Sequence, residues 1–161
     1  MKDKLIEVKH IKKYFPVGRD AFLHAVDDVS FDIEKGEIFG IVGESGSGKS
    51  TIGRCILKLV DIDEGQVIFE KKRVDNLDKE HLRQIRQQMQ MVFQNPLASF
   101  NPKKYIGASF MELGKVYKIP REEMNKSIIN LLELINLPAD VLTRMPNQLS
   151  GGQLQRLAVA R

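Results

Sequence analysis

Apolar residues along the chain follow two different spacings, which predict a strand-rich beginning and a helical end. Alternating apolar and polar residues, and short apolar runs, are typical of strands. Strands are therefore expected at residues 5–15, 25–33, 38–42, 66–69 and 89–93. The continuous apolar runs at 38–42 and 89–93 favour strands that are buried on both faces of a parallel sheet.

Apolar residues three or four positions apart predict helices, because such residues share one helical face. The predicted helices cover residues 50–60, 79–88, 106–117, 124–135 and 151–161. Asp78 is expected to cap the second of them, while Leu59 and Val60 should continue the apolar face of the first. The order of these elements predicts an α/β core followed by a helical part.

The composition is that of an ordinary folded protein, with 161 residues, of which 42% are apolar and 29% charged. This length is enough for one domain with its own core. No apolar run is long enough to span a bilayer and no signal peptide is recognisable, so any membrane-spanning part should come from another chain. The single cysteine, Cys55, favours a reducing compartment and is expected to be buried filler.

The formal net charge is +4, and charges of both signs are interspersed along the chain. Asp61 and Asp63, for example, stand shortly before Lys71 and Lys72. This mixture indicates a solvated surface rather than a patch that binds nucleic acid or anionic lipid.

Residues 43–51 match the pattern G-x-x-x-x-G-K-[ST] of a phosphate-binding loop, here called the phosphate loop. They are Gly43, Glu44, Ser45, Gly46, Ser47, Gly48, Lys49, Ser50 and Thr51. Glycines let the backbone approach a phosphate closely, and N–H groups of the loop and of the following helix attract an anion. Lys49 is expected to reach the β- and γ-phosphates, and the Ser50 hydroxyl to coordinate Mg²⁺. The loop alone leaves kinases, GTPases, helicases and transporters open.

A second glycine-containing string lies far downstream and is here called the signature motif. It consists of Leu149, Ser150, Gly151, Gly152 and Gln153. Ser150 is a good helix N-cap, and the glycines expose backbone N–H groups that make a second anion site. By itself the string could be an ordinary capped helix. Together with the phosphate loop, it makes the whole chain resemble the ATP-binding subunits of ABC transporters.

The resemblance implies a nucleotide site shared by two chains. In ABC ATPases two domains pack head to tail, and each ATP lies between one phosphate loop and the other subunit's signature motif. Ser150, Gly152 and Gln153 would thus contact the γ-phosphate of an ATP bound by the partner. Gln94 resembles the Q-loop glutamine, which reaches Mg²⁺ and the attacking water.

The same resemblance implies a residue for the base. Phe15 takes the place of the A-loop aromatic, which stacks on adenine, and Tyr14 is the neighbour that could replace it. An aromatic side chain packed in the core is the alternative explanation.

Residues 93–102 resemble the stretch after the Q-loop in ATP-binding subunits of oligopeptide and dipeptide importers, a pattern that nickel importers share. This implies transport of peptides, nickel or another small solute through integral membrane permease subunits, with a solute-binding protein as an indirect partner. The protein would be peripheral, on the cytoplasmic face of the cell membrane. The alternatives are a soluble ABC ATPase acting on nucleic acid or the ribosome, and a nucleotide-binding module without catalysis. No nucleic-acid partner is expected, because no aromatic and basic stripe is present.

The family's pattern continues with a Walker B strand, a D-loop and a switch histidine, all of which would follow Arg161. We therefore expect an α/β fold: a P-loop NTPase core with an N-terminal antiparallel β subdomain and an inserted α-helical subdomain, without the C-terminal part of the core. Residues 1–37 should form mainly the β subdomain, 38–100 the core with the phosphate loop and Q-loop, and 101–161 the helical subdomain with the signature motif. The chain alone is expected to bind ATP and to hydrolyse it negligibly.

Overall fold

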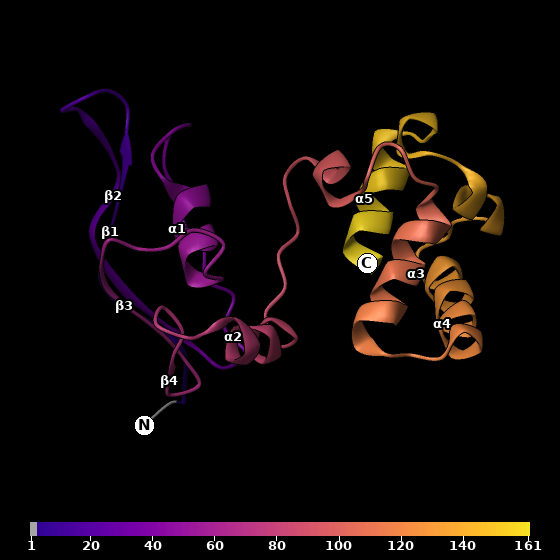
Figure 1. Cartoon of the computed structure of the whole chain (residues 1–161), viewed down its shortest axis with the longest axis horizontal. Coiled ribbons are helices and arrows are strands. Elements are labelled where there is room, and N and C mark those ends of the chain that lie inside the picture. Colours follow the sequence, from indigo (N-terminus) through magenta and orange to yellow (C-terminus); the bar gives the residue numbers. More distant parts are fainter. Residues whose placement is uncertain (1–2) are drawn as a thin grey trace. The chain divides into compact units, whose positions relative to one another are not determined.

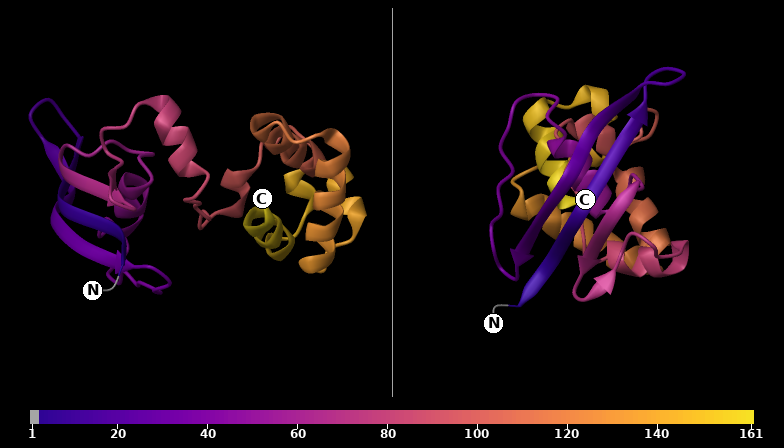
Figure 2. Two further views of the ribbon diagram at one scale, coloured as in Figure 1. Left: turned by 90° about the horizontal axis from the view of Figure 1, so that it is seen from below. Right: turned by 90° about the vertical axis from the view of Figure 1, so that its left-hand side faces the viewer.

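Two long strands, β1 (Lys4–Pro16) and β2 (Phe22–Glu34), pair antiparallel at the start of the chain (Figure 1). The computed structural model describes residues 3–161. On its other side β1 pairs with β3 (Glu64–Phe69), and β3 pairs with β4 (Lys72–Arg73), so the sheet order is β2-β1-β3-β4. All of its pairings are antiparallel, as Figure 2 shows for the long strands. The predicted N-terminal antiparallel sheet is confirmed.

The sheet packs against two short helices to form the core of unit 1, the part of the chain up to Gln90. These helices are α1 (Lys49–Ile56) and α2 (Lys79–Arg86). Buried residues of this core come from β1, β2, β3, α1 and α2: Val8, Ile11, Val26, Ile52, Cys55, Ile56, Val67, Leu82 and Ile85. Cys55 is 1% exposed and burial raises the pKa of its thiol, which confirms it as buried filler. Asp78 caps α2 as predicted, since its side chain accepts the N–H groups of Glu80 and His81.

The prediction of buried parallel strands at 38–42 and 89–93 is wrong. Neither segment is a strand, and Ile38 and Val42 are 100% and 94% exposed. A strand needs a paired neighbouring strand to satisfy its backbone groups, and no strand among residues 3–161 pairs with either segment. Phe39 is held in another way, by stacking on Phe31 of β2 with ring centroids 4.9 Å apart.

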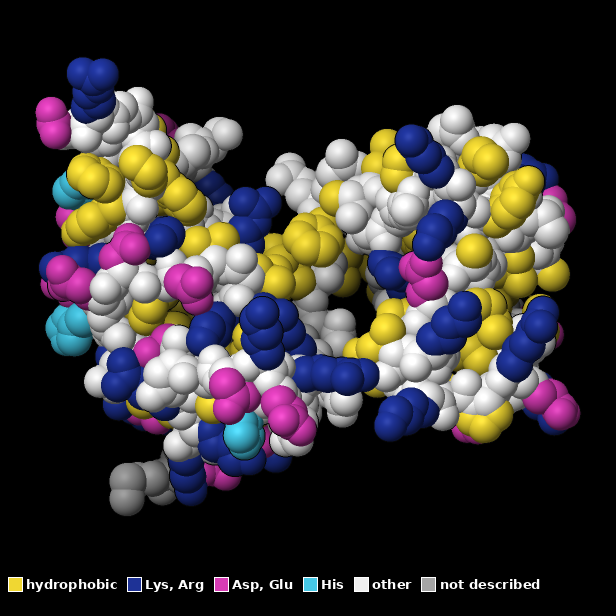
Figure 3. Space-filling model, viewed as in Figure 1, with side chains coloured by type: hydrophobic (Ala, Val, Ile, Leu, Met, Phe, Trp, Pro, Cys, Tyr) yellow, Lys and Arg dark blue, Asp and Glu magenta, His cyan; other side chains and the backbone are white. Residues whose placement is uncertain are grey.

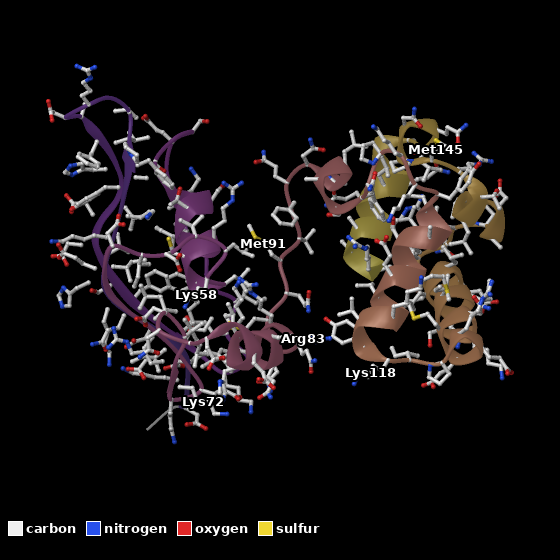
Figure 4. All side chains as sticks on the ribbon, viewed as in Figure 1. Lys58, Lys72, Arg83, Met91, Lys118 and Met145 are labelled. Atoms are coloured by element: carbon white, nitrogen blue, oxygen red, sulfur yellow. The ribbon has the colours of Figure 1, made fainter. Side chains whose placement is uncertain are left out.

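The first predicted helix ends earlier than expected, at Ile56 rather than at residue 60. Lys58 adopts a left-handed backbone with φ 48°, and the Leu59 N–H donates back to Arg54 O at 2.8 Å. This bonding closes a helix in a Schellman-type turn, so the chain leaves the helix axis and Leu59 is 46% exposed. Lys58 marks the end of α1 in Figure 4.

Unit 2 (Met91–Arg161) contains helices and 3-10 turns but no strand among its residues, and its helices from residue 106 on follow the predicted apolar spacing. Its helices are α3 (Ile106–Tyr117), α4 (Arg121–Leu134) and α5 (Gly151–Ala160), with 3-10 turns η1 (Pro96–Ser99), η2 (Ala139–Thr143) and η3 (Pro146–Gln148). Its buried core includes Ile106, Phe110, Ile128, Leu132, Leu154 and Leu157. None of the helices among residues 3–161 combines the length and the apolarity needed to cross a bilayer.

Charges of both signs are mixed over the surface of unit 1, as Figure 3 shows for the face toward the viewer. Several form ion pairs across the sheet, such as Lys4 with Asp32 at 2.6 Å and Lys12 with Glu64 at 2.8 Å. The surface of unit 1 therefore carries interspersed charges of both signs, several of them in ion pairs, as the sequence predicts.

Candidate nucleotide-binding site

The phosphate loop is anchored on the sheet through its last glycine. Gly48 has φ +88°, and a Cβ added to it would lie 2.0 Å from the carbonyl oxygen of Ala25 in β2. Gly46 also has positive φ, at +84°, but faces open space. Only glycine therefore lets the loop lie directly on the backbone of β2 before it enters α1.

Lys49 folds back over the loop that precedes it. Its ammonium donates to the carbonyl oxygens of Gly43 at 2.8 Å and Glu44 at 2.5 Å, and it lies 3.2 Å from Ser47 Oγ. The ammonium thus lies by the first residues of the loop, while α1 and its first N–H groups begin at the last ones. The first turn of α1 contains no acidic side chain and Gly48 offers no side-chain cap, so these N–H groups suit an anion.

The other loop residues remain accessible or partly accessible. Those classed as exposed are Gly43, Glu44, Ser45, Gly46, Ser47 and Ser50, while Gly48, Lys49 and Thr51 are partly buried. The Ser50 hydroxyl is thus free to meet a cation beside bound phosphates. Among residues 3–161 no three His, Cys, Asp or Glu side chains gather into a group that could hold a metal ion.

Phe15 and Tyr14 point to opposite faces of β1, because successive side chains of a strand alternate. The Tyr14 hydroxyl donates to Asp27 Oδ1 at 2.5 Å, which raises the pKa of Tyr14, and its ring stacks on His24 at 4.0 Å. Phe15 is half-buried and shares its face with Lys13, whose ammonium lies 5.5 Å from the ring centroid. That face also carries α1, because Ile11, two residues before Lys13 on β1, lies in the same buried core as Cys55 of α1. Tyr14 is thus engaged by Asp27 and His24, and the role of Phe15 toward a base stays a prediction.

Gln94 lies in an irregular, exposed segment at the start of unit 2. Figure 4 marks Met91 in the same segment, which has no regular structure before η1. The next residue, Asn95, caps η1 by accepting the Leu97 N–H at 3.1 Å. The role of Gln94 toward Mg²⁺ and water stays a prediction.

The signature motif forms the beginning of α5, with Ser150 as the N-cap that the sequence predicts. The Gln153 N–H donates to Ser150 Oγ at 3.3 Å, and the Ser150 N–H donates to Gln153 Oε1 at 2.9 Å. Leu149 is buried at 9% exposure, whereas Gly151 and Gly152 are exposed, and a Cβ added to either would meet no atom within 4 Å. An anion can therefore approach the helix start closely. The capping bonds use the backbone N–H and the side-chain oxygen of Gln153, so its side-chain NH₂ group is a further donor.

Sequence reasoning missed Asp63, which it grouped with the solvated charges. Asp63 Oδ2 accepts the Tyr14 N–H at 2.6 Å and Oδ1 accepts the Lys13 ammonium at 2.9 Å, while its own N–H donates to Lys12 O at 2.8 Å. These partners are about fifty residues away in the sequence, so no local pattern signals them.

We expect Asp63 to make the stability of unit 1 depend on pH. The Tyr14 N–H, followed by the Lys13 ammonium, lowers the pKa of Asp63. Because the folded chain then binds this proton less tightly than the unfolded chain, the stabilisation is complete above the ordinary aspartate pKa and is lost as the pH falls through the lowered pKa. The urea midpoints of the parent chain and of Asp63→Asn should differ at neutral pH and converge in acid. A difference that stays constant with pH would contradict this.

The comparisons with known proteins agree with these two motifs. The ABC transporter family matches residues 26–161. The oligopeptide transport ATP-binding protein OppF of Streptococcus mutans is 43% identical over 160 residues, covering 98% of this chain and 52% of its own length. The dipeptide transport ATP-binding protein DppF of Lactococcus lactis is 44% identical over 163 residues, with 98% and 52% covered. The chain thus spans about half the length of these relatives.

Solved structures give the same result for the fold. A dimeric ATP-binding cassette in a post-hydrolysis state, bound to ADP and Pi, superposes with a TM-score of 0.82 at 31% identity, covering 97% of this chain and 68% of that one. Another dimeric structure, of a bacterial ABC transporter cassette, gives a TM-score of 0.83 at 32% identity. Since the family match covers most of the chain, including both the phosphate loop and the signature motif, this chain belongs to the ABC transporter family.

Proposed function

We propose that this chain supplies the ATP-binding part of an importer that moves peptides, or nickel or another small solute, across a membrane. The observation that carries the proposal is the phosphate loop, in which the Lys49 ammonium folds back onto Gly43 and Glu44 and the start of α1 has no side-chain cap. The peptide cargo is supported by the relatives, which are named oligopeptide and dipeptide transport ATP-binding proteins.

Within this proposal, each part of the site has one task. The N–H groups of residues 43–51 hold the phosphates, Lys49 neutralises charge on the β- and γ-phosphates, and Phe15 stacks on adenine. Ser50 and Gln94 would bind Mg²⁺. When bound, this ion would neutralise negative charge on the phosphates and so assist transfer of the γ-phosphoryl group.

The signature motif is proposed to act on a nucleotide bound by a second subunit. Leu149 and Gly151 position the motif, and Ser150, Gly152 and Gln153 meet the γ-phosphate from the side opposite a partner's phosphate loop. A head-to-tail dimer would then close around ATP, and hydrolysis would release it. The further partners proposed are integral membrane permease subunits on the cytoplasmic face and, indirectly, a solute-binding protein.

The test is ATP-dependent uptake by membrane vesicles that contain the full protein carrying this chain, together with its membrane partners. A labelled oligopeptide should accumulate with the parent protein and with Lys72→Ala, which removes an exposed lysine of β4. Accumulation should be lost with Lys49→Ala. Uptake of Ni²⁺ without uptake of peptide would identify nickel rather than peptide as the transported solute. Peptide uptake that survives Lys49→Ala would contradict the proposal.

A further inference from the structure

Asp63 joins the segment after α1 to three consecutive residues of β1. Its backbone N–H donates to Lys12 O, and its two carboxylate oxygens accept the Lys13 ammonium and the Tyr14 N–H, at distances of 2.6 to 2.9 Å. Three bonds from one residue determine where this part of β1 lies, since each fixes a different backbone or side-chain group.

The Lys13 ammonium lies between Asp63 and the ring of Phe15. It is 2.9 Å from Asp63 Oδ1 and 5.5 Å from the centroid of the ring, and only 14% of the Lys13 side chain is exposed. A cation at this distance is attracted to an aromatic face. Lys13 therefore holds one face of the Phe15 ring, and because Phe15 is only half-buried, part of the ring remains accessible to another flat group.

The same region contacts the phosphate loop through β2. Gly48 lies against Ala25 O, and the neighbouring Val26 is the register partner of Lys13. Asp63 is reached from the other end of α1, through the segment that leaves the helix near Lys58 (Figure 4). Both ends of α1 are thus tied to this region of the sheet. Its start contacts β2 through Gly48, and the segment after its end contacts residues 12–14 of β1 through Asp63.

We propose that Asp63 is a positioning residue that, through Lys13, orients the ring of Phe15 toward the base of a nucleotide bound at the phosphate loop. The proposal rests on the proposed function, because it requires a nucleotide there. Asp63 itself touches neither base nor phosphate. Its removal should loosen the ring and weaken the contribution of the base to affinity, while the phosphate loop keeps its conformation.

The experiment separates the contribution of the base to affinity from that of the phosphates. The purified chain is titrated in a calorimeter with ATP and, separately, with inorganic tripolyphosphate, both in the presence of Mg²⁺. The parent chain should bind ATP about tenfold more tightly than tripolyphosphate, because stacking of one base contributes about this much affinity. Asp63→Ala should reduce this ratio by about threefold or more, with tripolyphosphate affinity unchanged. The matched control is Asp61→Ala, which removes an exposed carboxylate two residues away.

Lys13→Met supplies a second variant, which keeps the aliphatic stem and removes the ammonium over the ring, and it should lower the same ratio. A ratio that is unchanged in both variants would overturn the proposal, as would a parallel loss of affinity for both ligands. If the parent chain bound ATP no more tightly than tripolyphosphate, the proposal for Asp63 would be overturned, whereas the phosphate site itself would be supported. If the parent chain bound neither ligand, the proposed nucleotide-binding function would be contradicted, and the proposed role of Asp63, which depends on it, would be contradicted as well.

Discussion

Replacing Lys49 by alanine is expected to weaken ATP binding by about a hundredfold or more. The ammonium already folds back over the loop, where it bonds to the carbonyl oxygens of Gly43 and Glu44. With a nucleotide present it would exchange these for phosphate oxygens. Two hydrogen bonds between charged groups contribute about 3 kcal/mol or more, which corresponds to that factor.

Calorimetric titration with MgATP would measure this loss, with Lys72→Ala as the control for removing one positive charge from unit 1. Lys72 is exposed and lies on β4, so its variant should bind ATP as the parent does. Inorganic tripolyphosphate should lose affinity with Lys49→Ala to the same degree, since Lys49 meets phosphate and not base. Equal ATP affinity in the two variants would remove Lys49 from the site.

The second large effect is expected from Gly48→Ala, which should destabilise unit 1 by about 3 kcal/mol or more. The added Cβ would lie 2.0 Å from Ala25 O, and the left-handed backbone at φ +88° is unfavourable for alanine as well. Because the obstacle is backbone rather than a flexible side chain, the loop would have to leave β2.

Gly46→Ala is the matched control for this substitution. Its φ is +84°, nearly that of Gly48, but the added Cβ would meet nothing within 4 Å. Only the backbone strain should remain, about 1 kcal/mol. Urea unfolding of the two variants would separate strain from close packing, and equal destabilisation would show that the contact with Ala25 is unimportant.

Features with a local cause could be predicted from the sequence. Asp78 and Ser150 are N-caps because their side chains reach N–H groups two or three residues ahead, and both were predicted from that spacing. The apolar spacing of α3 and α4 likewise needed no knowledge of distant residues. The phosphate loop is recognisable because its pattern of glycines, lysine and serine is contained in nine consecutive residues, whereas the contact of Gly48 with Ala25 is not visible in that pattern.

Features that depend on distant residues could not be predicted. The apolar run at 38–42 has the composition of a buried strand, but no strand among residues 3–161 pairs with it. The end of α1 was missed because its left-handed residue is Lys58, whereas glycine is the usual signal for such an ending. Asp63 was missed because its partners belong to β1, on the far side of β2 and α1 in the sequence.

The strand order of the sheet has a consequence for the sequence of events in folding. β1 and β2 are joined by a short turn, whereas β1 meets β3 through pairs such as Ile6 with Phe69, so this second pairing closes a long loop. Pairings that close long loops form more slowly, so the β1–β2 hairpin should form first. The phosphate loop and α1 lie within the stretch that the later pairing closes. Substitutions in the phosphate loop should consequently speed unfolding while leaving the refolding rate nearly as it was.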